Sequence, residues 1–206
     1  GLPDSGEPIV DLFSAQTAHS LAWTWYLLGD RLDAVSPLVR PRLAREIDRR
    51  VLAPYEQRED FWWMGFAPRA SRPNNWNPWI NSNVLAAALL VEPDAARRAA
   101  LVHKTLRSLD TFLGPHPSDG GCDEGPSYWG RAGASLFEAL EVLHSASAGR
   151  VSYFANPVVA DIGRYIYRVR IAGAWFVDVG DSGAKVGFDR GLIFRYGKAI
   201  GDPGLA

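Results

Sequence analysis

The 206-residue sequence is poor in sulfur and nearly balanced in charge, with one cysteine (Cys122), one methionine and a net charge of −1. A single cysteine excludes an internal disulfide and provides no thiolate set for a structural zinc site. No apolar run approaches the roughly 20 residues that cross a bilayer. The charge balance argues against broad binding to nucleic acid or to anionic membranes. Because the four histidines lack the spacing of a metal motif, we expect no metal and no other cofactor.

Aromatic residues are abundant: the chain has eight tryptophans, seven tyrosines and nine phenylalanines. Several tryptophans fall in or beside loop-like segments. Buried tryptophans fill cores, whereas tryptophans at loop ends form flat platforms for sugar rings, and composition leaves both interpretations open. With 47% hydrophobic residues, the chain has ample material for one core and fits one domain, or one domain with part of another.

Hydrophobic periodicity predicts six helices and an all-α fold class. Gly29-Asp30 is interpreted as the stop of the first helix, and Asn156-Pro157 as the cap of the sixth. The residues AWFVDVG after Gly173 are typical of a strand. The expected helices cover residues 8–28, 36–55, 79–91, 94–113, 127–147 and 157–169.

Short connections favour antiparallel packing of successive helices, so the loops should alternate between two ends of the array. One end then holds residues 57–75, residues 114–126 and the segment after Ile171. Long loops in compact domains are usually functional, and these carry most of the unusual residues. We therefore expect the functional site at this end.

The chain begins at Gly1 without a signal-peptide pattern and stops where strand-like and helix-like signals mix. We expect it to be part of a longer protein, with a helical domain at residues 1–172. Residues 173–206 would lead toward a β-sandwich domain. An export signal would already have been removed, which is compatible with a periplasmic or secreted protein.

The first unusual motif, RPNNWNPWINSN (residues 72–83), is rich in carboxamides and indoles. Asparagine is a good helix cap, but one cap explains only one or two of five asparagines. Carboxamides beside indoles suit a sugar, and an amide also donates hydrogen bonds to a carboxylate. The candidate binding residues here are Asn74, Asn75, Trp76, Asn77, Trp79 and Asn81.

The second motif, GPHPSDGGCDEGPSYWGRAG (residues 114–133), places a phenol between an acidic turn and an arginine. Asp123 and Glu124 favour a helix N-terminus, which explains one of them without a functional role. Tyr128 requires nearby positive charge to act as a base, and Arg131 lies three residues on. His116 belongs to the same long loop, and Trp129 is a further candidate for sugar binding.

Together NNWNPWINSN, DGGCDEGPSYWGRAG and FVDVGDSGAK resemble the helical domain of heparinase II/III-like proteins, over nearly the whole chain. The resemblance implies an incomplete (α/α) toroid followed by β-sandwich domains. It also implies a bacterial polysaccharide lyase, whose partner is an acidic polysaccharide or oligosaccharide of uronic acids.

Tyr128 matches the family's catalytic tyrosine, which serves as general acid and also as a candidate base in β-elimination. The resemblance implies that Asn75 and Asn77, assisted by Arg131, neutralise the uronate carboxylate, and that Glu124 orients the tyrosine or a sugar hydroxyl. Characterised relatives often carry histidine at the position of Trp76, and His116 is the candidate substitute.

Two other functions remain open. A glycoside hydrolase on a related helical array would draw its acid and base from Asp123, Glu124, Asp178 and Asp181. A non-catalytic carbohydrate-binding domain would use the same aromatic and amide residues without turnover.

Overall fold

The computed structural model of the chain describes residues 6–67 and 72–206, and within them it is mostly helical. The first helix, α1 (Leu12–Leu27), is capped by Asp11, whose side chain accepts the backbone N–H of Ser14 at 2.7 Å. The helix predicted for residues 36–55 is built from α3 (Val39–Ile47), a π-helical turn (Asp48–Leu52) and α4 (Ala53–Gln57). The all-α prediction is confirmed, with a small sheet near the C-terminus.

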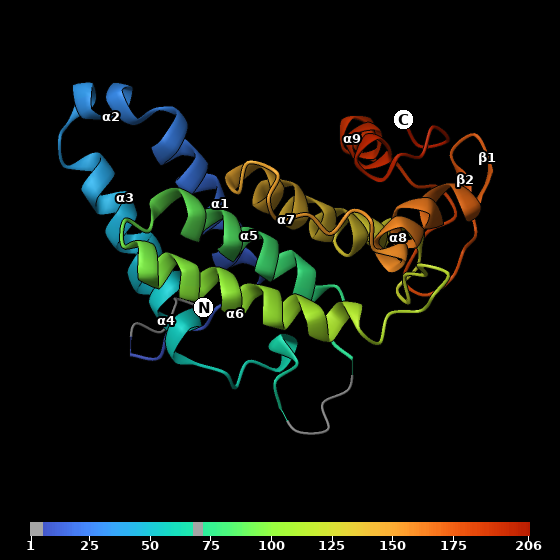
Figure 1. Cartoon of the computed structure of the whole chain (residues 1–206), viewed down its shortest axis with the longest axis horizontal. Helices are drawn as coiled ribbons and strands as arrows, with labels where there is room; N and C mark the ends of the chain where they lie inside the picture. The colour runs from blue at the N-terminus through green and yellow to red at the C-terminus, as the bar shows by residue number, and fades with distance from the viewer. Residues whose placement is uncertain (1–5, 68–71) are drawn as a thin grey trace.

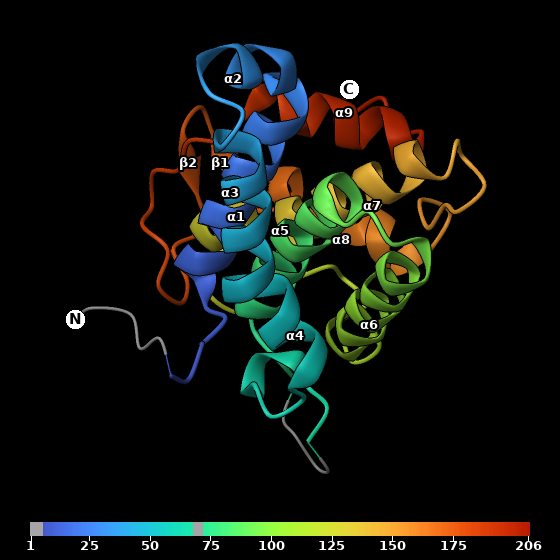
Figure 2. The ribbon, with the colours of Figure 1, turned by 90° about the vertical axis from the view of Figure 1, so that its left-hand side faces the viewer.

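Helix α5 (Trp76–Val91) is the central element of the fold (Figures 1 and 2). Most of its residues are buried because it contacts α1 on one side and two other helices on the others. One of these, α6 (Ala95–Leu113), follows after a short link and is capped by Asp94. The other is α7 (Gly133–Ala146). A helix that is apolar around most of its circumference belongs inside a bundle, as α5 does.

The apolar side chains form two clusters that share α5. Ile80 and Val84 pack with α1, α3 and α4, whereas Leu85 packs with α6, α7 and α8 (Pro157–Arg168). Helix α8 is capped by Asn156, as the sequence predicts: its side chain accepts the N–H of Val158 at 2.9 Å. The two clusters give the long helices a fixed arrangement, which positions the loops at their ends.

The predicted helices differ from the structure at two places. The first helix ends at Leu27 with Leu28 as its C-cap, next to the predicted stop at Gly29-Asp30, but a short helix, α2 (Gly29–Val35), follows it and was not predicted. Leu28 has non-helical backbone angles (φ −109°, ψ 11°), which separates α1 from α2. The fifth helix does not start at residue 127, since a 3₁₀ turn (Pro126–Gly130) precedes α7. Tyr128 therefore lies in this tight turn.

The C-terminal segment contains more helix than the sequence predicts. The strand expected at AWFVDVG is limited to β2 (Trp175–Phe176), which pairs antiparallel with β1 (Arg170–Ala172). It is followed by α9 (Arg190–Ile200), which was not predicted. Phe176 and Tyr196 are buried in the same cluster as α7 and α8. The segment after residue 172 therefore packs against the helical body.

Candidate functional site

Three segments that are far apart in the sequence meet at Glu124. The amide Nδ2 of Asn74 donates to Glu124 Oε1 at 2.9 Å, and that of Asn75 donates to Oε2 at 2.6 Å. From the third segment, the backbone N–H of Asp181 donates to the carbonyl oxygen of Glu124 at 3.2 Å. The predicted gathering of the long loops at one end of the helices is thus confirmed for these three segments.

Arg72 makes further contacts between the first two segments. Its Nη2 donates to Asp123 Oδ2 at 2.7 Å, and its Nη1 lies 3.0 Å from Nδ1 of His116. The guanidinium and the imidazole both lie against the ring of Phe112 at the end of α6. Because the guanidinium only donates, His116 Nδ1 must accept in this arrangement, which places the proton of the neutral ring on Nε2.

Glycine permits the close approach of the loops. Gly125 has φ of +88°, and a Cβ atom at this position would lie 2.1 Å from the carbonyl oxygen of Val179. Only glycine tolerates both the left-handed backbone and this contact. Next to it, the N–H of Ser127 donates to Ser182 Oγ at 3.0 Å. The loop that carries Glu124 therefore packs directly against residues 179–182.

Burial shifts the pKa values of two groups in the site. Partial desolvation raises the pKa of Glu124 above its ordinary value, and the negative charges of Asp123 and Asp181 add to this effect. The amides of Asn74 and Asn75 act in the opposite direction, because they stabilise the carboxylate form. Burial lowers the pKa of His116, and the positive charge of Arg72 lowers it further. His116 is therefore neutral at neutral pH.

Tyr128 lies four residues after Glu124, in the 3₁₀ turn, with its ring packed partly against the second apolar cluster. Within the described part of the chain its hydroxyl makes no hydrogen bond, and the hydroxyl oxygen is not buried. The hydroxyl therefore reaches solvent. This position leaves the phenol free to contact a bound molecule.

Aromatic and cationic groups adjoin the amides on α5. The guanidinium of Arg131 lies 4.2 Å from the ring centroid of Trp79, a cation–π arrangement. Trp76 is half-buried, and its ring centroid lies 5.3 Å from that of Trp62, which is 57% exposed. The first turn of α5 thus presents aromatic surface next to the asparagines that contact Glu124.

Three of the candidate residues do not lie on this surface. Asn77 is fully buried, and its Nδ2 donates to the carbonyl oxygens of Trp63 and Ser108 at 2.8 and 2.9 Å. Asn81 is also fully buried and accepts the hydroxyl of Tyr55 at 2.7 Å. These amides satisfy polar groups between helices, so their positions do not suit contact with a substrate.

Trp129 is the third. It is 2% exposed, and its indole Nε1 donates to the carbonyl oxygen of Ile162 on α8 at 2.8 Å. Its ring stacks on that of Tyr196, with the centroids 6.1 Å apart. Trp129 is therefore a core residue that fixes the 3₁₀ turn on α8, which corrects its interpretation as a sugar platform.

The carboxylates of the hydrolase alternative have different surroundings. Asp123 is paired with Arg72, whereas Asp178 and Asp181 are exposed. Glu124 differs from them because its two carboxylate oxygens accept amide hydrogens from two asparagines. Glu124 is therefore the carboxyl group with the most distinctive environment.

Sequence reasoning missed Arg72 and Ser182. Arg72 opens the asparagine-rich motif, but nothing in its spacing indicates a partner 51 residues away. Ser182 belongs to a Gly-Asp-Ser-Gly stretch that is explained by a turn alone. Long-range pairing of this kind follows from the fold and has no signal in local sequence.

Neither a protein-family model nor a curated protein matches this chain. Residues 6–67 and 72–206 contain no group of three or more His, Cys, Asp or Glu side chains placed to hold a metal ion. None of the helices described above is both long enough and apolar enough to cross a membrane.

Proposed function

We propose that this chain is the helical part of a polysaccharide lyase, an incomplete (α/α) toroid that binds an acidic polysaccharide. The reaction would be β-elimination at a uronic acid. In such a step the bond from C5 to its hydrogen and the bond from C4 to the glycosidic oxygen break, and a C4–C5 double bond forms. The proton removed at C5 must be accepted, and the departing oxygen must receive one.

The observation that carries the proposal is the convergence of Asn74 and Asn75 on Glu124. A carboxamide nitrogen has two hydrogens, and Glu124 accepts one from each residue. The second hydrogen of each amide is then held in a fixed direction. Asn74 is half-buried and Asn75 is 5% exposed, so Asn74 has more surface open to a ligand and Asn75 would donate from the floor of the site. Two oriented donors suit the carboxylate of a uronate, and they stabilise the negative charge that develops on it when the neighbouring proton leaves. Glu124 is in this scheme a positioning residue.

Tyr128 is the proposed acid–base group. Its hydroxyl is free of partners among the described residues, and it follows Glu124 by four positions. A phenol O–H is a hydrogen-bond donor that can deliver its proton to the departing oxygen. If the same hydroxyl oxygen takes the C5 proton and passes it to the departing oxygen, one group serves both transfers and the step needs no second base. Arg131, whose guanidinium lies over the ring of Trp79, would assist the amides in neutralising the uronate carboxylate. Trp76 and Trp79 would hold neighbouring sugar rings.

One observation favours a second candidate, a glycoside hydrolase. The raised pKa of Glu124 is the property expected of a general acid in that chemistry. Asp181 would then be the partner carboxylate. In this scheme the two asparagines stabilise Glu124 itself and make no contact with a uronate.

Product analysis distinguishes the candidates. The product of the full open reading frame is incubated with a panel of uronic-acid polymers, and ultraviolet absorbance and reducing ends are both followed. The lyase proposal predicts an absorbing, unsaturated uronate that accumulates together with reducing ends. Reducing ends without absorbance would establish the hydrolase, and binding of oligosaccharides without either signal would indicate a carbohydrate-binding domain.

A further inference from the structure

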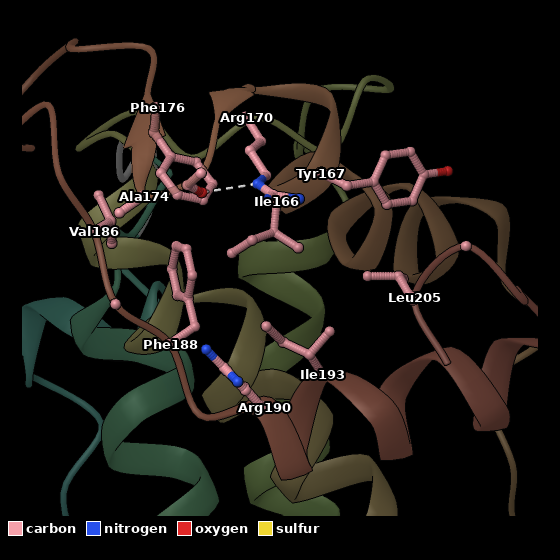
Figure 3. A pocket seen from close by; sticks show the side chains of 13 residues that line it. Ile166, Tyr167, Arg170, Ala174, Phe176, Val186, Phe188, Arg190, Ile193 and Leu205 are labelled. Atoms are coloured by element: carbon pink, nitrogen blue, oxygen red, sulfur yellow. Dashed lines mark hydrogen bonds between the residues drawn. The ribbon is translucent and has the colours of Figure 1, made fainter.

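A separate cavity of about 650 Å³ lies near the C-terminus, between α8, the β1–β2 hairpin and α9 (Figure 3). It is formed by residues 166–176, 186–193 and 204–205, and none of the residues assigned above to the candidate functional site lines it. Cavities of this size are typical of small-molecule sites. The proposed lyase chemistry does not use it.

The walls of this cavity are apolar. Ile166, Phe176 and Leu205 are mostly buried and form part of the core beneath it. Other apolar side chains stand at its sides, and Figure 3 shows them facing one another across the space: Phe188, Val186 and Ile193. Contact with these groups would remove the apolar part of a ligand from water, which is favourable in proportion to the apolar area buried.

The charges that line the cavity all have one sign. Arg170 and Arg190 enter from opposite walls, above and below the apolar side chains in Figure 3, and none of the described residues that line the cavity is acidic. Arg170 Nε donates to the carbonyl oxygen of Gly173 at 2.9 Å, which fixes the side chain and leaves both terminal nitrogens available. Arg190 forms no ion pair or side-chain hydrogen bond within the part of the chain that the structure describes.

The nearest acidic side chain along the chain does not neutralise Arg190. Asp189 caps α9, and its Oδ1 accepts the backbone N–H of Leu192 at 3.1 Å. The two guanidinium groups therefore lack a carboxylate partner in the cavity. A guanidinium offers paired donors that match the two oxygens of a carboxylate.

From this combination we infer that the cavity binds an amphipathic carboxylate, with the carboxylate paired with Arg170 or Arg190 at one side of the cavity and the aliphatic body against Ile166, Phe188 and Ile193. An uncharged apolar molecule would leave both cations unpaired. A small hydrophilic anion would leave the apolar walls in contact with water. Only a ligand with both parts matches the whole surface.

The test is isothermal titration calorimetry with octanoate, compared with 1-octanol and acetate. Octanoate should bind with a stoichiometry of one and more tightly than either comparison compound. The Arg170→Gln/Arg190→Gln double variant should lose about tenfold or more of the octanoate affinity, while 1-octanol binding changes less than about twofold. Arg31→Gln, on exposed α2, is the matched control and should bind as the unmodified protein does.

A blocking variant locates the site independently. Ala174 lines the cavity but is exposed, so Ala174→Trp should fill the mouth without disturbing the core, and octanoate binding should be lost. Circular dichroism verifies the fold of each variant. The inference is overturned if octanoate binds no more tightly than 1-octanol. It is equally overturned if the double variant or Ala174→Trp binds octanoate with undiminished affinity.

Discussion

The carboxylate of Glu124 accepts the amide N–H of Asn75 at 2.6 Å, although 49 positions separate the two residues in the chain. The same carboxylate accepts Asn74 through its other oxygen. One acidic side chain therefore fixes the direction of two neighbouring amides on the loop before α5. The proposed site depends on this arrangement more than on any single residue.

Replacing Glu124 with glutamine should disturb the amides without disturbing the fold. Glutamine keeps the size of the side chain but has one carbonyl oxygen, so it can accept only one of the two asparagines. We expect kcat/KM on a uronic-acid polymer to fall about 10- to 100-fold, because misplaced groups at a reacting centre are costly. The thermal midpoint should change little. Asp178→Asn, an exposed change on the third segment, is the control, and an unaltered rate in Glu124→Gln would contradict the positioning role.

The two asparagines Asn75 and Asn77 should behave differently when each is changed to alanine. Asn77→Ala leaves the carbonyl oxygens of Trp63 and Ser108 without this donor in a buried place, which should cost about 2–3 kcal/mol in the free energy of unfolding. Asn75→Ala should mainly reduce substrate binding and turnover. Urea denaturation and steady-state kinetics on both variants separate the effects. Equal losses of stability and of activity in the two variants would argue against a structural role for Asn77 and a substrate-binding role for Asn75.

Much of the fold could be predicted from the sequence, because α5, α6 and α8 combine clear helical periodicity with proline or capping signals. Helix α9 was missed because Gly191 and Gly197 interrupt its pattern. Gly197 is required where Leu205 approaches the helix, at 2.7 Å from where its Cβ would lie. That contact is tertiary, so local propensity gives no indication of it.

The site could be predicted only in outline. The motif at residues 72–83 indicates an unusual concentration of amides, but its spacing does not say which of them point inward. Asn75 precedes α5 and reaches Glu124, whereas Asn77 and Asn81 point into the interior toward Ser108 on α6. The orientation of each side chain is set by the packing of α5 between its neighbours.

Acidification should destabilise the contact between Arg72 and His116. Because the pKa of His116 is lowered in the folded protein, its contribution to stability is complete above the unfolded value near 6.5 and is lost as the pH falls through the folded pKa. Protonation places a hydrogen on Nδ1 facing the guanidinium. We expect His116→Gln to lose less stability than the unmodified protein between pH 7 and pH 5, as measured by chemical denaturation.

His103→Gln is the matched control for that experiment, since His103 is exposed on α6. Its pH dependence of stability should follow that of the unmodified protein. If His116→Gln retains the full loss of stability on acidification, the contact with Arg72 does not depend on a neutral imidazole.

Adjacent tryptophans provide a test of the core. Trp63 is 2% exposed and stacks with Phe61, at 5.5 Å between ring centroids, whereas Trp62 is 57% exposed. Trp63→Ala should lower the free energy of unfolding by about 3–5 kcal/mol, because it opens a large cavity in the core. Trp62→Ala should cost less than about 1 kcal/mol. Guanidinium titrations compare the two, and similar losses for both would show that the assigned burial is wrong.

The most direct test of the proposed chemistry is the rate at which the product of the full open reading frame releases ultraviolet-absorbing uronate, measured for Tyr128→Phe. The account predicts a loss of at least about 10²-fold in this rate, with binding of the oligosaccharide retained. Tyr153→Phe, a change at a 40% exposed tyrosine, should leave the rate unchanged. An undiminished rate in Tyr128→Phe would contradict the account.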